Sequence, residues 1–131
     1  MTPAHVFGKA PETTRARGQQ AEGLAAAHIE ALGYRLVERN FRCAAGEVDL
    51  IAWDGSVLCF IEVRSRATAD FGDPLETIGP QKIRRIVRAA REYLSRLDGP
   101  WPEMRFDAIG VLTSSTPPEI TLVRGAFEAH A

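Results

Sequence analysis

The sequence predicts a single α/β domain in which helices flank a mixed central β-sheet. Three observations predict this class: two stretches have apolar residues at helical spacing, five have the character of strands, and they follow one another in the order αβββαββ. A chain of 131 residues has the length of one domain and can bury a hydrophobic core without disulfides or a structural metal. We expect residues 1–14 to form a flexible N-terminal tail and residues 15–131 to form the domain.

Two segments show the periodicity of amphipathic helices. The first runs from residue 15 to residue 32 and ends before Gly33, a residue typical of the position after a helix. Its predicted buried face consists of Ala21, Leu24, Ala25, His28 and Leu32. The second begins at Pro80, because proline is favoured in a first helical turn, and ends at Leu97 before Asp98-Gly99-Pro100. Its predicted apolar stripe consists of Ile83, Val87, Ala90, Leu94 and Leu97.

Five segments have the alternation or the composition of strands, namely residues 34–41, 46–53, 57–64, 104–112 and 120–123. Asp54-Gly55 separates the second segment from the third and predicts a hairpin turn. The third segment is apolar on both faces between Val57 and Ile61, so we expect it in the middle of the sheet. Residues 67–79, which contain Phe71-Gly72-Asp73-Pro74, are predicted to be a loop.

The composition excludes several classes of protein. There are 16 Lys and Arg residues against 17 Asp and Glu residues, and the net charge of −1 excludes a histone-like protein that coats nucleic acid through bulk positive charge. The longest uncharged stretch, 108–118, is too short to span a membrane. The first residues lack the pattern of a secretory signal, and the two cysteines form no CxxC pair. We therefore expect a cytoplasmic protein without a zinc site.

Acidic residues concentrate in the predicted hairpin, where residues 43–63 contain four acids and no base. Side chains alternate along a strand, so Glu47 and Asp49 share one face of residues 46–53, the first strand of this hairpin. The hairpin turn brings Asp49 close to Glu62. Two desolvated carboxylates need a compensating cation, and Mg²⁺ prefers carboxylate oxygens together with water and substrate phosphate. The alternative is a surface network in which these acids pair with Arg64 and Arg66 across the hairpin.

These residues resemble a known pattern. Asp49, twelve further residues and then Glu62-Val-Arg64 are similar to the D…(D/E)xK core of the restriction-endonuclease-like nucleases, written PD-(D/E)xK. More closely, Gly46-Glu-Val-Asp-Leu-Ile-Ala52 and Phe60-Ile-Glu-Val-Arg-Ser-Arg66 resemble the YraN-like family of small uncharacterised bacterial proteins, which has been likened to Holliday-junction resolvases. The resemblance implies a restriction-endonuclease-like core in a nuclease-like domain. It also implies an endonuclease that depends on Mg²⁺ or Mn²⁺ and acts on DNA, including branched or structured DNA, or on another nucleic acid.

The resemblance also implies roles for single residues. Asp49 and Glu62 match the metal-binding carboxylates, Glu22 matches an acid that completes such sites, and Glu47 is an auxiliary ligand on the same strand face. Arg64 stands where the pattern has a lysine, and arginine supplies charge but cannot lose its proton to act as a base. The alternatives are that Glu22 and Glu47 are solvated side chains, and that the domain binds nucleic acid without turnover.

The second predicted helix is basic. It carries six bases against one acid, Glu92, and five arginines fill the arc opposite its apolar stripe: Arg84, Arg85, Arg88, Arg91 and Arg96. A phosphate backbone matches such a face, so we predict that nucleic acid is bound by Lys82, Arg84, Arg85, Arg88 and Arg66. Lys82 could also supply an amine that Arg64 lacks. The alternatives are a solvated face and a protein partner. Symmetric cleavage of two strands would need a homodimer, for which the sequence carries no signal.

Overall fold

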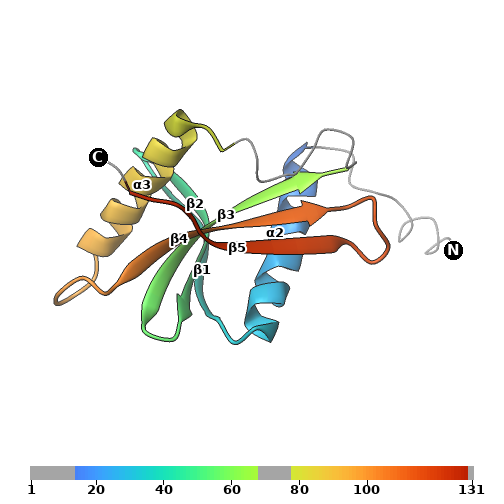
Figure 1. Ribbon diagram of the computed structural model, residues 1–131. Coiled ribbons are helices and arrows are strands. Elements are labelled where there is room, and N and C mark those ends of the chain that lie inside the picture. Colours follow the sequence, from blue (N-terminus) through green and yellow to red (C-terminus); the bar gives the residue numbers. More distant parts are fainter. Residues whose placement is uncertain (1–13, 68–77, 130–131) are drawn as a thin grey trace, which may run out of the picture.

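The computed structural model describes residues 14–67 and 78–129, which form one five-stranded sheet with a helix against each face (Figure 1). In chain order the elements are α2 (Thr14–Ala31), β1 (Arg35–Cys43), β2 (Gly46–Asp54), β3 (Val57–Arg66), α3 (Pro80–Ser95), β4 (Met104–Leu112) and β5 (Glu119–Phe127). The predicted fold class and element order are confirmed. The predicted tail, apart from Thr14, and residues 68–77 of the predicted loop lie outside the described residues.

The sheet has the spatial order β1-β2-β3-β4-β5 and is mixed, as predicted. Its neighbouring strands are antiparallel except for β3 and β4, which are parallel and have α3 in the connection between them. The predicted hairpin turn is present, because Asp54 pairs with Val57 and leaves Gly55 and Ser56 between the strands. β3 is the central strand that its two-sided apolar run predicts. Among the described residues, no helix is long and apolar enough to cross a membrane.

Two apolar cores lie on the two faces of the sheet. On one face Ala25 and Ile29 of α2 pack with residues of the central strands such as Ile61. On the other face Ile86 and Leu94 of α3 pack with an aromatic cluster: Phe41, Phe60, Tyr93, Phe106 and Phe127. Burial of both faces of β3 makes the sheet the middle layer of a three-layer domain.

The buried face of α2 differs at its end from the predicted one. Leu32 is 51% exposed, and Ile29 is buried in its place. The helix ends at Ala31, and Gly33 with a φ of 97° turns the chain back toward the sheet. The backbone N–H of Tyr34 donates to the carbonyl of Ile29, and that of Gly33 donates to Glu30. This C-terminal turn carries Leu32 outward, while Gly33 ends the helix as predicted.

The last strand is longer than predicted, because β5 continues to Phe127 instead of ending at residue 123. Gly125 has a φ of 64°, and the pairing between β4 and β5 shifts register between Phe106 and Ala108. The backbone N–H of Gly125 donates to the buried carboxylate of Asp107 at 3.0 Å. A β-bulge at this point lets the strand continue beyond the irregularity.

Strict alternation along β2 would place Val48 and Leu50 on the same face of the sheet, but the structure places them on opposite faces. Leu50 packs in the core beneath α2, whereas Val48 packs beneath α3. On the neighbouring strand, Asn40 has a left-handed φ of 55°, and the next residue, Phe41, pairs with Val48 and is buried on the α3 face. The local bend of the two strands breaks the alternation beside Asp49.

Candidate functional site

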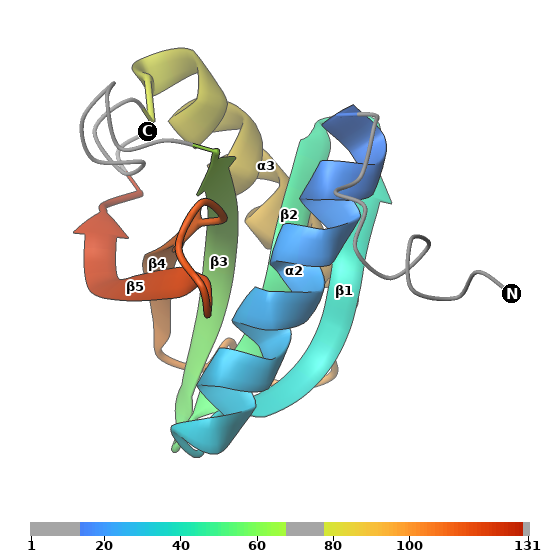
Figure 2. The ribbon, with the colours of Figure 1, turned by 90° about the vertical axis from the view of Figure 1, so that its right-hand side faces the viewer.

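The strands β2 and β3 separate beyond the middle of the hairpin, and this separation positions the candidate site. Their pairing runs from Asp54 and Val57 to Leu50 and Ile61. From there β2 continues paired to β1, and β3 continues paired to β4. Figure 2 shows the two strands diverging beside the N-terminal half of α2. The next two residues of the hairpin, Asp49 and Glu62, therefore lie where the strands part.

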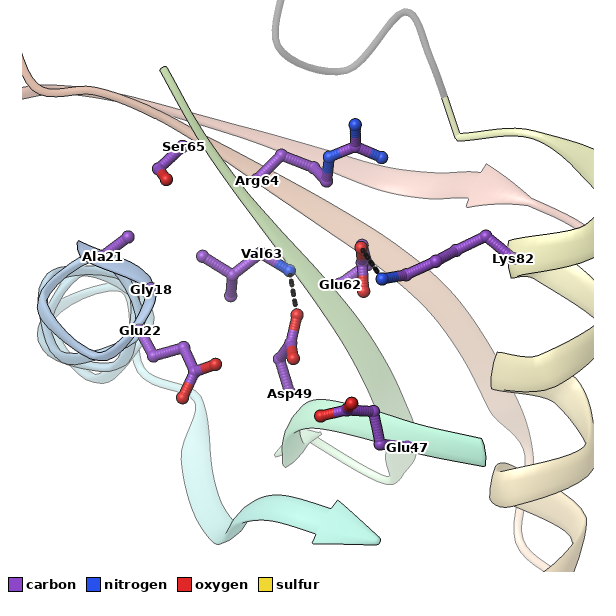
Figure 3. A pocket seen from close by; sticks show the side chains of 10 residues that line it. All are labelled: Gly18, Ala21, Glu22, Glu47, Asp49, Glu62, Val63, Arg64, Ser65 and Lys82. Carbon is purple, nitrogen blue, oxygen red and sulfur yellow. Dashed lines mark hydrogen bonds and ion pairs between the residues drawn. The ribbon is translucent and has the colours of Figure 1, made fainter. Parts of the chain in front are cut away.

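A pocket of about 490 Å³ occupies this fork. Its lining combines four acidic and two basic side chains with small residues: Gly18, Ala21, Glu22, Glu47, Asp49, Glu62, Val63, Arg64, Ser65 and Lys82. Figure 3 shows that Glu22 approaches from α2 and Lys82 from α3, on opposite sides of Asp49 and Glu62. The fold thus brings together, from α2, β2 and β3, every residue predicted to be catalytic or to bind metal, and α3 adds Lys82.

The half-buried carboxylate of Asp49 and the buried carboxylate of Glu62 form the centre of the pocket. The Glu62 side chain is only 3% exposed, and its Oε2 lies 3.3 Å from Nζ of Lys82. An oxygen of Asp49 accepts a hydrogen bond from the backbone N–H of Val63 at 2.8 Å. Beyond the last backbone pair of β2 and β3, the side chain of Asp49 thus accepts the hydrogen bond that a backbone carbonyl of β2 would otherwise accept.

Burial makes ionisation of this pair unfavourable. Desolvation, followed by the charge of Asp49, raises the pKa of Glu62 to about 8. Desolvation also raises the pKa of Asp49, although the N–H of Val63 opposes the change. The pair therefore retains a proton near neutral pH unless a cation stronger than Lys82 compensates for both charges.

Glu22 approaches the pair from α2 with one carboxylate oxygen buried and without a hydrogen-bond partner. Desolvation and the charge of Asp49 raise the pKa of Glu22, while the side-chain amide of Asn40 lowers it. Asn40 was not among the predicted site residues. The signal for it was an asparagine within a strand segment, because asparagine tolerates the left-handed backbone that Asn40 adopts.

Glu47 lies at the rim of the pocket rather than at its centre. Its side chain is partly exposed, and one of its oxygens lies 3.6 Å from Nε of Arg42. A smaller hollow between β2 and α3 adjoins the pocket at Glu47 and Lys82 and is lined further by Arg85 and Ile86. The acidic centre is therefore continuous with the first turns of the basic helix.

Gly46 sets the distance between that helix and the site. A Cβ atom added at Gly46 would lie 2.5 Å from the carbonyl oxygen of Arg85, closer than real Cβ contacts. Only glycine allows the backbone of α3 to approach the beginning of β2 so closely. This contact holds Lys82 and Arg85 beside the acidic pocket.

The predicted nucleic-acid contacts divide into two groups. Lys82 lines the pocket and Arg85 lines the adjoining hollow. Arg84 and Arg88 are exposed on α3, as their place opposite the apolar stripe predicts. Arg66, at the end of β3, does not line the pocket, and its backbone carbonyl accepts hydrogen bonds from Thr113. A phosphate-binding role for these side chains stays a prediction.

The donor set of the pocket fits a hard divalent cation such as Mg²⁺ or Mn²⁺. Carboxylate oxygens are the ligands that these ions take, and the pocket offers the buried carboxylate of Glu62, the half-buried one of Asp49 and an unpartnered oxygen of Glu22. Within residues 14–67 and 78–129, however, no three acidic, histidine or cysteine side chains already lie in positions to hold one ion. An ion bound by Asp49 and Glu62 would have to draw Glu22 or Glu47 toward it or take water in their place.

A second polar cluster, at the other end of the α2 face, is a structural one. Asp107 is fully buried and accepts hydrogen bonds from the hydroxyl of Tyr34 at 3.0 Å and from the guanidinium of Arg105 at 2.8 Å. Arg105 also donates to Asp54 at 2.9 Å, in the β2–β3 hairpin. The cluster joins β2 and β4 to the turn before β1, and its acids and base satisfy one another.

Comparison with known proteins shows one family. A family model described as "Uncharacterised protein family UPF0102" matches residues 21–111. A UPF0102 protein of Anaeromyxobacter sp. (strain Fw109-5) is 45% identical over 116 residues, which cover 88% of this chain and 87% of the relative. A UPF0102 protein of Dechloromonas aromatica is 52% identical over 101 residues, covering 77% and 82%. One of Chlorobaculum parvum is 48% identical over 98 residues, covering 75% and 76%.

Proposed function

The chain belongs to the UPF0102 (YraN-like) family, as its motifs indicated, and from the geometry of its pocket we propose that it is a metal-dependent nuclease acting on DNA or another nucleic acid. The observation that carries the proposal is the Asp49–Glu62 carboxylate pair in a pocket that adjoins a basic helix. The αβββαββ order and the mixed sheet are consistent with the restriction-endonuclease-like core that the resemblance implied.

Asp49 and Glu62 would hold the cation, and Glu22 and Glu47 would assist. A bound Mg²⁺ or Mn²⁺ would polarise the phosphodiester and make a bound water a better nucleophile. In hydrolysis a water oxygen forms a bond to phosphorus, the bond from phosphorus to the leaving oxygen breaks, and that oxygen takes up a proton.

The cationic side chains would stabilise the negative charge that grows on the phosphoryl oxygens. Arg64 lies two residues beyond Glu62 on β3 and lines the same pocket. A positive charge there would stabilise the negative charge that develops on the phosphoryl oxygens in the transition state. An arginine side chain supplies charge and does not act as a proton-transfer base, so we assign Arg64 charge stabilisation rather than proton transfer.

The basic face of α3 would bind the sugar–phosphate backbone that leads into the pocket. The helix has one acid, Glu92, which is outnumbered by exposed bases on the helix and at its C-terminal cap: Lys82, Arg84, Arg85, Arg88, Arg91 and Arg96. Contacts of this kind attract phosphate irrespective of sequence. The proposed substrate is therefore a nucleic acid recognised by its backbone and shape, DNA being the first candidate.

Cleavage assays with Mg²⁺ or Mn²⁺ on linear, flapped and four-way DNA and on single-stranded RNA test the proposal. We expect Asp49→Asn and Glu62→Gln each to lower the rate by roughly 100-fold or more, because each removes a buried ligand charge. The matched control is Glu30→Gln, which changes an exposed glutamate on the outer side of α2. Rates in both pocket variants equal to that of the control would refute the assignment.

One observation favours a second candidate, a nucleic-acid-binding module without turnover. Arg64 replaces the lysine of the nuclease pattern, and no three ligands in the described part of the chain are already positioned for an ion. This candidate predicts salt-sensitive binding to DNA that survives Asp49→Ala and weakens when Arg85 and Arg88 are both changed to Ala. Binding of this kind without cleavage of any of the four substrates would favour it over the nuclease.

A further inference from the structure

Lys82 occupies an unusual place for a basic residue of this chain. Fourteen of the 16 basic residues are arginines, and Lys82 is one of only two lysines. It reaches from the first turn of α3 across the pocket to Glu62, with Nζ 3.3 Å from Oε2 (Figure 3). Glu62 is almost fully buried while the lysine side chain is 48% exposed. The ammonium is thus a mobile cation on a flexible stem placed against a fixed buried carboxylate.

The position of this amine is built into the fold. Pro80 begins α3, the N–H of Ile83 donates to the carbonyl of Gly79, and Gly46 admits the backbone of the next turn against β2. The first turn of the helix therefore holds the stem of Lys82 at the rim where the pocket meets the hollow lined by Arg85. The ammonium of Lys82 can therefore reach either Glu62 or an anion that enters the pocket beside Glu62.

We propose that Lys82 exchanges partners: it pairs with Glu62 in the metal-free protein and, once a divalent cation takes that carboxylate, turns to the substrate phosphate. The proposal rests on the proposed function, because both partners belong to the same pocket. The nuclease pattern has a lysine where this chain has Arg64, and the proposal gives the role of that amine to Lys82 on α3. Because the ammonium contacts Oε2 of Glu62, a metal ion that takes this oxygen would displace it.

The competition predicts opposite effects of one substitution on two measurements. Removing the ammonium with Lys82→Met should tighten Mn²⁺ binding to the metal-free protein about two- to fivefold, the equivalent of one partly exposed ion pair. The same variant should lower the cleavage rate by roughly 100-fold, because a phosphate contact in the transition state is lost. Lys82→Arg retains the charge and should leave Mn²⁺ binding within about twofold of wild type.

Isothermal titration of Mn²⁺ into the full-length protein, run beside the cleavage assay, tests the proposal. The control is Arg124→Met, which removes the charge of a different partly exposed ion pair, the one that Arg124 of β5 forms with Asp54 at the end of β2. Mn²⁺ binding that is weakened or unchanged by Lys82→Met would overturn the exchange. Tightened binding with an unchanged cleavage rate would overturn the phosphate contact.

Failure of the proposed function has a different signature. Suppose that the wild type binds Mn²⁺, that Lys82→Met binds it more tightly, and that the wild type cleaves none of the four substrates. This result would support the exchange at Glu62 and refute the nuclease. Absence of Mn²⁺ binding in wild type and in Lys82→Met alike would overturn both proposals. Thermal melting of each variant confirms that the differences do not come from unfolding.

Discussion

Replacement of Glu62 by glutamine should stabilise the metal-free protein and flatten its dependence on pH. The side chain of Glu62 is 3% exposed, and burial beside Asp49 raises its pKa from an ordinary 4.5 to about 8. Between these values the folded protein holds a proton that the unfolded chain has released. The free energy of unfolding therefore falls as pH rises from about 4.5 to about 8.

The size of the effect follows from the two pKa values. At about 1.4 kcal/mol per pH unit, the folded protein should lose roughly 4 kcal/mol of stability between pH 4.5 and pH 8. Glutamine has nearly the same shape and stays neutral, so Glu62→Gln should lose none of this. The variant should match wild type near pH 4.5 and exceed it by about 3–4 kcal/mol near pH 8.

Urea unfolding in EDTA, followed by tryptophan fluorescence from pH 4.5 to pH 8.5, measures the difference. Comparing the two proteins at each pH cancels the contribution of other titrating groups, and Glu30→Gln serves as the exposed control. A constant difference between wild type and Glu62→Gln across the range would refute the reasoning. Addition of excess Mn²⁺ should restore part of the stability of wild type at pH 8, because binding to the folded state stabilises it.

Three further predictions concern structure. Asp107→Asn should destabilise the protein by about 3–5 kcal/mol in urea unfolding, since it removes the fully buried carboxylate of the pair with Arg105 and turns an amide NH2 toward donors that the carboxylate accepted from; a loss below about 1 kcal/mol would contradict this. Gly46→Ala should cost about 2 kcal/mol or more, because its methyl group meets a backbone carbonyl of α3, and an unchanged melting temperature would refute the close approach. In the native protein a thiol reagent should label Cys43 and not Cys59, because burial raises the pKa of the Cys59 thiol to about 12; equal labelling rates would show that this side of the sheet opens.

The site could be predicted from local sequence only in part. The hairpin spacing brought Asp49 opposite Glu62, because a two-residue turn and a period of two settle which residues of neighbouring strands meet. The spacing did not indicate Asn40, whose left-handed backbone bends β1, or the break in alternation at Val48. Both depend on how the aromatic core under α3 packs, which no local pattern contains.

The same distinction holds for the helices. Gly33 and Pro80 marked helix ends correctly because capping and proline chemistry act within a few residues. The burial of Ile29 and the exposure of Leu32 depended on where the chain turns back to the sheet. Whether a residue near a helix end is buried depends on the part of the chain that packs against it. The helical period alone does not specify this contact.

By itself the sequence determined the α/β class, the order of elements, the family and the acidic hairpin, because periodicity, turn residues and motif spacing are local properties. Only the tertiary structure decided that β2 and β3 part at Asp49, that Glu22 enters the fork from α2 and that Lys82 pairs with Glu62 from α3. Contacts between elements distant in the chain arise from packing on both faces of the sheet. They determine burial, and burial gives the two carboxylates their raised pKa values and their need for a cation.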